Sequence, residues 1–172
     1  MIPPAPNASP SVTSNTDEGS PRRVVTFGLN DVLLGIDIRV VQEINRTLDY
    51  TAVPGSPRHI AGVVNLRGNV VTVIDAHELL RLTAPPNHDG GHNLILTFDG
   101  ERIGIPVEGE LDILDIDPAR LSPRPTNLRA IDARLIESVY LRDNDVVILL
   151  DPDAFLAATL PSAESAELPR AA

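Results

Sequence analysis

Short polar turns between apolar runs constrain the fold of this chain more than any other feature. Three segments each consist of a Val/Ile/Leu-rich run, a turn of Asn, Asp or Gly, and a second apolar run: residues 24–36, 94–105 and 139–150. Turn residues that tolerate positive φ, flanked by β-branched runs, are the strongest local signal for a β-hairpin. The sequence therefore predicts hairpins at these three places. The first two share a Thr-Phe before the turn and a Gly-Ile after it, which suggests two similar β subdomains.

Helices are predicted to be few and short. Asp75 with Glu78 has the capping-box arrangement, and Asp151 followed by Pro152 has an N-cap before a first-turn proline. Both aspartates directly follow a Val/Ile/Leu run, and N-capping is a sufficient role for each, without catalysis. The expected fold is mainly β, built from small barrels that close so that no long strand edge is exposed.

The two ends of the chain differ in composition from its middle. Residues 1–21 are rich in Pro, Ser, Thr, Asn and Gly, and residues 161–172 are small and polar, so we expect a disordered N-terminal tail and a flexible C-terminal tail. Residues 22–160 form the predicted domain. We see no basic and apolar regions of a signal peptide and no apolar stretch of the roughly 18 residues that a membrane span needs. A cytoplasmic location without direct membrane insertion is expected.

Composition excludes several kinds of function. The 172-residue chain has a formal net charge of −10, no cysteine, and 14 basic residues that are all arginine. The negative charge argues against nucleic acid and against anionic membranes as partners. Without Cys or Lys there is no disulfide, thiolate nucleophile, P-loop lysine or Schiff base. Arginine forms planar, bidentate contacts that suit protein interfaces. We expect no cofactor.

Two groups of residues raise the alternative of a small metal-dependent hydrolase. His88 and His92 are four residues apart, which chelates metal on a helix face, but here they lie in a Gly-containing loop. An acidic run does not follow the EF-hand pattern, and its interleaved apolar residues favour a strand with a solvated acidic face: Glu108, Glu110, Asp112, Asp115 and Asp117. We therefore predict no metal site.

The stretch of residues 60–75 favours a protein-binding role over an enzymatic one. It joins two β-branched runs through Asn65-Leu66-Arg67-Gly68 and has no catalytic group except Arg67. By chemistry alone, a solvated turn charge is the simpler interpretation of Arg67. Val41 and Glu43 alternate along an extended run, so we expect them on one face of a strand, where a charge beside an apolar residue suits a protein contact.

An ordered set of motifs over residues 24–156 resembles the CheW-like chemotaxis coupling proteins. The motifs are Leu34-Gly35-Ile36-Asp37, Val41-Gln42-Glu43-Ile44, Pro54 and Pro57, Ile60…Gly62…Asn65-Leu66-Arg67-Gly68…Asp75, Ile103-Gly104-Ile105-Pro106-Val107, and Val146-Val147-Ile148-Leu149-Leu150-Asp151. The resemblance implies two small five-stranded, SH3-like β-barrels packed together, and no enzymatic activity. The predicted function is an adaptor in bacterial chemotaxis; an adaptor of a non-motility chemosensory pathway stays an open alternative.

The resemblance also implies partners and site residues. Members of the family bind the regulatory domain of the histidine kinase CheA, itself CheW-like, and the cytoplasmic tip of chemoreceptors (methyl-accepting chemotaxis proteins). Together these form an array, in which other CheW-like domains are further candidate partners. The kinase-binding positions correspond to Val41 and Glu43, and the receptor-binding positions to Gly62, Asn65, Arg67 and Val107. The chain departs from the family pattern at Val107-Glu108-Gly109, where Asp instead of Glu is usual before the small residue, and at Ser138, where Gly is frequent.

Overall fold

A computed structural model describes residues 21–46, 48–84, 91–128 and 131–160 of the chain. Its strands are β1 (Arg23–Leu29), β2 (Val32–Asp37), β3 (Val41–Arg46), β4 (Ile60–Leu66), β5 (Asn69–Ile74), β6 (His92–Phe98), β7 (Glu101–Asp115), β8 (Leu121–Pro123), β9 (Ile136–Arg142) and β10 (Asp145–Leu150). Its α-helices are α1 (Ala76–Leu80) and α2 (Pro152–Thr159), and its 3-10 turns are η1 (Ile38–Val40), η2 (Pro118–Arg120) and η3 (Ala133–Leu135). The prediction of a mainly β fold with a few short helices is confirmed.

The three predicted hairpins are present as the antiparallel pairs β1–β2, β6–β7 and β9–β10. Their turns contain residues with positive φ, such as Asn30 (54°), Asp99 (49°) and Asp143 (44°). Asn and Asp tolerate this left-handed backbone better than other non-glycine residues, which is why the turn composition was informative. The two predicted helix caps are also confirmed, because the Asp75 and Asp151 side chains accept backbone N–H groups of α1 and α2.

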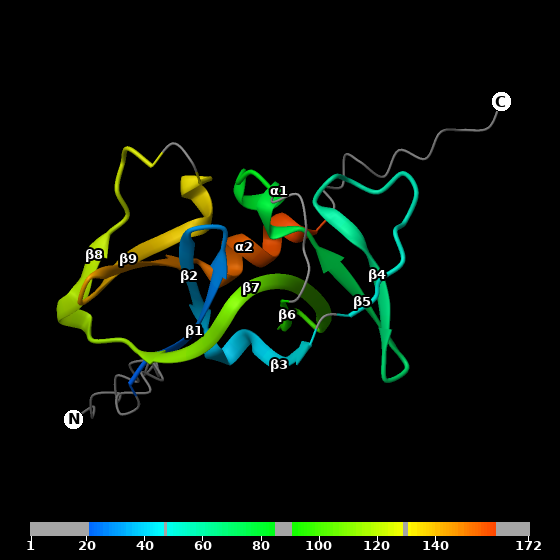
Figure 1. Ribbon diagram of the computed structural model, residues 1–172, viewed down its shortest axis with the longest axis horizontal. Helices are drawn as coiled ribbons and strands as arrows, with labels where there is room; N and C mark the ends of the chain where they lie inside the picture. Colours follow the sequence, from blue (N-terminus) through cyan, green and yellow to red (C-terminus); the bar gives the residue numbers. More distant parts are fainter. Residues whose placement is uncertain (1–20, 47, 85–90, 129–130, 161–172) are drawn as a thin grey trace, which may run out of the picture.

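The strands form two parts that share the long strand β7. The β1 part has the order β7-β1-β2-β10-β9-β8, and the β6 part pairs β3 with β6, β6 with β7, β7 with β5 and β5 with β4. β7 pairs with β5 and β6 through its first half and with β1 through its second half. β8 and β9 therefore lie at one end of the molecule, and β4 and β5 at the opposite end (Figure 1).

The expectation that the sheets close into barrels is wrong. Within the described ranges, β3 pairs only with β6 and β8 only with β9, so the sheet is not closed. One isolated bridge ties the segment after β3 to β4, through Thr51 and Val63 with N···O distances of 2.8 and 2.9 Å. The physical reason is that β7 serves both parts at once, while β8, at three residues, is too short to complete the β1 part.

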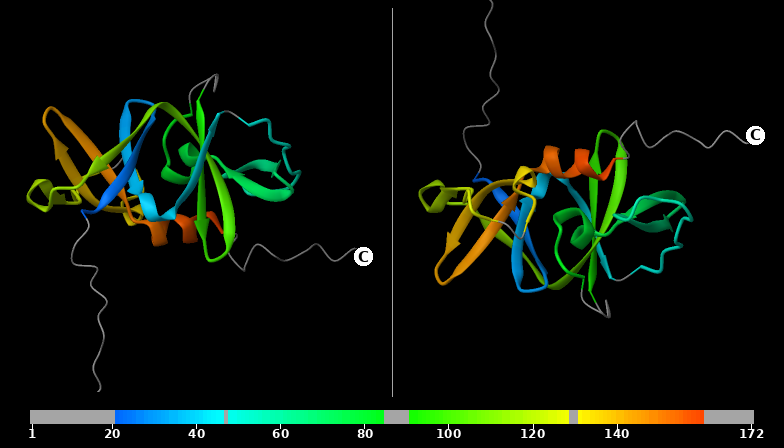
Figure 2. Two further views of the ribbon diagram at one scale, coloured as in Figure 1. Left: turned by 90° about the horizontal axis from the view of Figure 1, so that it is seen from below. Right: turned by 90° about the horizontal axis from the view of Figure 1, so that it is seen from above.

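The main core lies between the two parts. Fully buried side chains from both contribute to it, including Phe27 and Leu34 from the β1 part and Leu94 and Ile105 from the β6 part. Helix α2 lies across the junction in both views of Figure 2 and adds the buried Phe155. This continuous core fixes the orientation of the two parts, so a surface on one is positioned rigidly against the other.

The predicted tails, residues 1–21 and 161–172, fall outside the described ranges except for Pro21. Among the described helices, none has the length and apolar character needed to cross a membrane.

Candidate functional site

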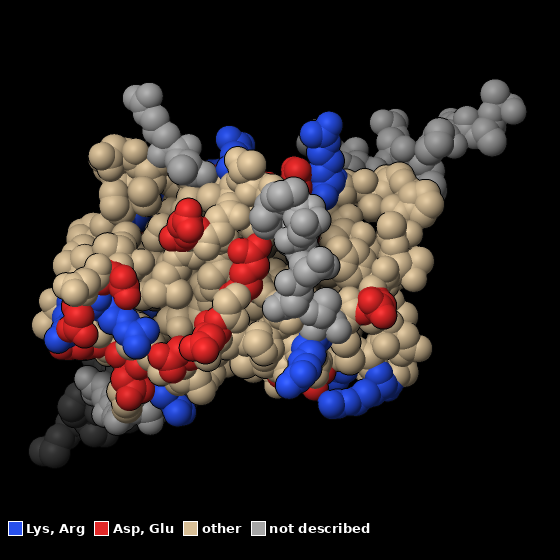
Figure 3. Space-filling model, viewed as in Figure 1, with Lys and Arg blue, Asp and Glu red and all other residues tan. Residues whose placement is uncertain are grey.

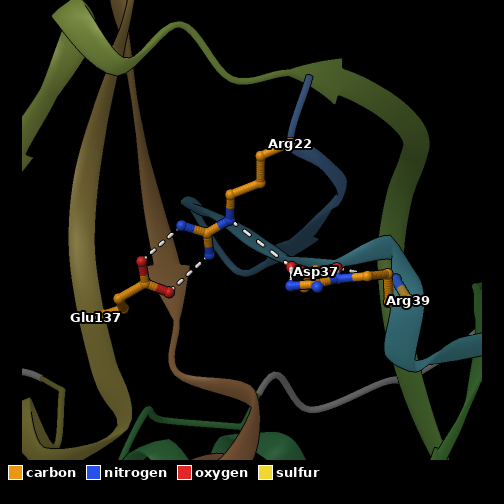
Figure 4. A network of polar contacts seen from close by, with 4 residues as sticks. All are labelled: Arg22, Asp37, Arg39 and Glu137. Carbon is orange, nitrogen blue, oxygen red and sulfur yellow. Dashed lines mark hydrogen bonds and ion pairs between the residues drawn. The ribbon is translucent and has the colours of Figure 1, made fainter. Parts of the chain in front are cut away.

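The strand β3 begins at a network of ion pairs beneath the turn η1. The Asp37 carboxylate is 4% exposed and accepts three hydrogen bonds from Arg39, from its backbone N, Nε and Nη2, at 2.8–3.0 Å. Arg22 Nε lies 3.7 Å from the same carboxylate, and both Arg22 Nη atoms donate to Glu137 at 2.6 Å (Figure 4). The hydrogen bond from the Arg39 side chain is the main cause that lowers the pKa of Asp37. The network therefore ties β1, β2 and β9 to the turn that leads into β3.

Val41 and Glu43 do not share one face of β3, contrary to the prediction from their alternation. The pairing with β6 shifts register between them, so that Val41 lies opposite Leu96 and Glu43 opposite Ile95. Neighbouring residues on a strand face opposite sides. Val41 is half-buried against the main core, whereas Glu43 turns toward the β4–β5 hairpin. A β-bulge was not readable from the sequence because it depends on the partner strand.

Arg67 lies at the tip of the β4–β5 hairpin, in a two-residue turn with Gly68. Their φ values are 53° and 85°, and both being positive indicates a type I′ turn. The Asn65 side chain accepts the Gly68 N–H at 2.9 Å, which stabilises this turn. Asn65 therefore has a structural role that fixes the position of the Arg67 backbone.

An ion pair joins the predicted kinase-binding and receptor-binding positions. Arg67 Nη1 donates to Glu43 Oε2 at 3.1 Å, and Asn45 Nδ2 donates to the other Glu43 oxygen at 3.0 Å. The Arg67 side chain is 76% exposed and that of Glu43 is 23% exposed. We name Glu43, Asn45, Asn65 and Arg67 the charged junction. It connects β3 to the β4–β5 hairpin, two elements that are not hydrogen-bonded strand neighbours.

The other two predicted positions lie apart from the charged junction. A Cβ atom at Gly62 would overlap the carbonyl oxygen of Thr51 and crowd the Tyr50 ring, so only glycine allows the bridge between Thr51 and β4. Val107 is 2% exposed in the main core. Gly62 therefore allows the close backbone contact between Thr51 and β4, and the Val107 side chain packs in the core.

Sequence reasoning missed the exposed apolar side chains on the strands that carry the charged junction. Val70 is 72% exposed directly opposite Asn65, and Ile44, which follows Glu43 on the other face of β3, is 42% exposed. Alternation along β5 carried a signal for Val70, because its neighbours Val71 and Val73 are fully buried. Exposed apolar residues beside a guanidinium are typical of protein-binding surfaces.

Buried polar groups near α1 line a small cavity in the described part of the chain. A cavity of about 140 Å³ is lined by Leu48, Tyr50, Ala61, Asp75, His77, Asn93 and Pro106, none of which is Ser, Thr or Cys. His77 Nδ1 lies 3.4 Å from Asp75, and its Nε2 lies 3.6 Å from Glu108. The second Glu108 oxygen accepts the Asn30 N–H at 3.0 Å. These contacts tie α1 to β7 and to the β1–β2 turn, which is a structural arrangement.

The acidic run lies mostly along β7. Most of its carboxylates are exposed on the strand, and they do not converge on a common binding site. Glu110, Asp112 and Asp115 are exposed on this strand, as predicted, and acidic side chains gather over β1 and β7 in Figure 3. No group of three or more metal-ligating side chains occurs in the parts of the chain that the structure describes. His88 of the His88/His92 pair lies outside these parts.

Comparison with known proteins gives one consistent result. The model of the CheW-like domain family matches residues 23–160. The chain is 27% identical over 133 residues to the chemotaxis protein CheW of Treponema pallidum (strain Nichols), covering 75% of this chain and 78% of that protein. It is 25% identical over 134 residues to the chemotaxis protein CheW of Bacillus subtilis (strain 168), covering 78% and 86%.

A solved structure matches the fold as well. The crystal structure of the scaffolding protein TtCheW from Thermoanaerobacter tengcongensis superimposes with a TM-score of 0.70 at 26% identity. The match covers 80% of this chain and 88% of that one. The similarity thus extends over nearly all of the described domain, including the charged junction.

Proposed function

The chain belongs to the CheW-like domain family, and we propose that it couples chemoreceptors to the histidine kinase CheA in bacterial chemotaxis. It is a scaffold and adaptor, not an enzyme. Its partners belong to the chemotaxis pathway, and we infer that it acts in the cytoplasm, where the receptor tips and the kinase meet. The non-motility alternative and the hydrolase alternative are not favoured, because the relatives named above are chemotaxis proteins and scaffolds.

We assign the kinase contact to the exposed side of β3. This strand pairs on one side only within the described ranges, and its Ile44, which follows Glu43 in the chain and lies on the other face of the strand, is 42% exposed. On an edge strand, an exposed apolar residue can be buried by a partner, and a nearby charge can fix how the partner is aligned. Val41, at the start of the strand, is half-buried against the main core, so it contributes mainly by holding β3 in place.

We assign the receptor contact to the β4–β5 hairpin. An amphipathic receptor helix would cover Val70, which is 72% exposed, and place a carboxylate or carbonyl oxygen on the Arg67 guanidinium. Gly62 and Asn65 hold the hairpin in place for this contact. Val107 would support it only indirectly, through the core.

The ion pair between Glu43 and Arg67 carries the proposal. Its atoms are 3.1 Å apart, and the Arg67 side chain is largely exposed, so the pair is worth about 0.2–1 kcal/mol. A receptor carboxylate that takes Arg67 away from Glu43 would change the charge that β3 offers to the kinase. The coupling from one copy is small, and many copies in an array would strengthen it.

The test uses variants that remove one charge at a time. Glu43→Gln should weaken binding to the CheA regulatory domain, and Arg67→Gln should weaken binding to a receptor signalling fragment, each measured by co-sedimentation. Glu101→Gln and Arg23→Gln are matched controls, because both residues are exposed and lie outside the charged junction. If the controls lose binding as strongly as the junction variants, the assignment of the two surfaces is wrong.

A further inference from the structure

A second surface feature lies on the helices, apart from β3 and the β4–β5 hairpin. It is a hollow of about 470 Å³ between α1, η3, α2 and the segment before β4. Its apolar floor includes Leu79, Leu135, Ala154 and Ala158. Ala154 and Ala158 are four residues apart on α2, so they present one small-residue face to the hollow. We name this feature the helix hollow.

Basic groups surround the helix hollow. Arg58, Arg81 and Arg134 line it, together with His59. Arg134 is engaged with Asp132, to which it donates from Nε at 3.0 Å and from Nη2 at 2.6 Å. Arg58 and Arg81 form no ion pair with any described residue, and the His59 Nε2 atom is buried without a hydrogen-bond partner among them. The hollow has two carboxylates: Asp132, which binds Arg134 and also attracts the Arg81 charge, and Glu78.

The apolar floor and the arginines around it together fit one class of ligand. The chain carries a net charge of −10, yet this hollow gathers three of its 14 arginines. A free inorganic anion would use the guanidinium groups but leave the apolar floor uncovered. A peptide segment with apolar residues on one face and carboxylates beside them would use both.

We propose that the helix hollow is a third interaction surface, which binds an acidic amphipathic segment of a partner protein. The apolar side chains of that segment pack on Leu79, Ala154 and Ala158, and its carboxylates bind Arg58 and Arg81. None of these residues belongs to the charged junction, so the proposal does not depend on how the kinase and receptor contacts are assigned.

The test measures fluorescence anisotropy of a labelled synthetic helical peptide, with Leu on one face and Glu beside it, against the full chain. The Arg58→Gln/Arg81→Asn double variant removes the two guanidinium charges that the proposal uses; Asn is chosen because Arg81 has φ of 61°, which Asn tolerates. The single variant Arg23→Gln is the charge control outside the hollow. We expect the wild-type chain to bind the peptide and the double variant to bind it about tenfold more weakly. Added salt should also weaken binding, and the control variant should bind like the wild type. A peptide with Gln in place of Glu should not bind.

Three results would overturn the proposal. The first is no binding of the Glu peptide at concentrations up to about 1 mM in low salt. The second is equal weakening by Arg23→Gln, which would mean that the peptide binds by unspecific attraction. The third is another occupant: displacement of the probe by a peptide copying residues 161–172, or self-association of the chain that the double variant abolishes. Thermal melting of each variant verifies that it is folded.

Discussion

Removing the Glu43 charge should tighten receptor binding while it weakens kinase binding. In the structure, Glu43 holds the Arg67 guanidinium at 3.1 Å, so a receptor carboxylate must compete with it. Glu43→Gln removes the competing charge and leaves a side chain of nearly the same size. The opposite signs for the two partners are what distinguish a linked pair from two independent surfaces.

The expected size follows from the exposure of the pair. Arg67 is 76% exposed and Glu43 is 23% exposed, so solvent screens the interaction, and its free energy is about 0.2–1 kcal/mol. Receptor affinity should therefore rise by about 1.4- to 5-fold, since 1.4 kcal/mol corresponds to about tenfold. Added salt should reduce the gain, because exposed charges are screened within about 10 Å at 0.1 M.

Isothermal titration of a receptor signalling fragment into wild type, Glu43→Gln and the control Glu101→Gln measures this effect. The double variant Glu43→Gln/Arg67→Gln should bind no tighter than Arg67→Gln alone, because the guanidinium that gains freedom is then absent. Unchanged or weaker receptor binding in Glu43→Gln would refute the link between the two positions. An equal gain in Glu101→Gln would attribute the effect to net charge.

Further predictions concern the residues that support the charged junction. Gly62→Ala should destabilise the protein by about 1–3 kcal/mol in urea unfolding, because its Cβ would break the two hydrogen bonds between Thr51 and Val63. Val107→Ala should cost about 2 kcal/mol of stability and leave receptor affinity of the folded protein unchanged, because Val107 is 2% exposed. The folded-state pKa of Asp37 is lowered, so its stabilising effect is present above its unfolded pKa of about 3.9 and is lost as pH falls through the folded value. Asp37→Asn should therefore remove part of the stability loss below about pH 4. A chelator should leave the melting temperature unchanged.

Each of these outcomes has a contradicting result. A fully stable Gly62→Ala protein would mean that the bridge to Thr51 contributes nothing. Weaker receptor binding in Val107→Ala at full stability would mean that this valine contacts the receptor after all. Acid unfolding identical in wild type and Asp37→Asn would mean that Asp37 keeps an ordinary pKa, and a melting temperature that falls with chelator would require a bound metal.

Local features of the sequence predicted the elements of this fold well. Turn residues at Asn30, Asp99 and Asp143 marked the hairpins, and Asp75 and Asp151 marked the helix starts, because each signal acts within a few residues. That the sheet stays open was not predictable in the same way. It depends on β7, whose 15 residues serve both parts, and this sharing is a non-local property of the folded chain.

At the charged junction, too, local features were predictable from the sequence and contacts between distant residues were not. The Asn65-Leu66-Arg67-Gly68 stretch predicted the turn and its exposed guanidinium, while the contact from Arg67 to Glu43 joins residues 24 positions apart and was not foreseen. The β-bulge in β3 separated Val41 from Glu43, although their alternation placed them together. Burial of Val107 likewise depends on the packing between the two parts. Pairings between distant strands decide these features, and a single sequence does not state them.

Bridging of two partners by this chain is the most direct test of its function as a coupler. The measurement is co-sedimentation of CheA with membranes that contain a full-length receptor from the same genome, with and without the chain. We predict that the kinase sediments with the receptor only when the chain is added, and that Arg67→Gln reduces the amount while Arg23→Gln does not. Kinase that sediments equally well without the chain, or a chain that binds each partner only when the other is absent, would contradict the account.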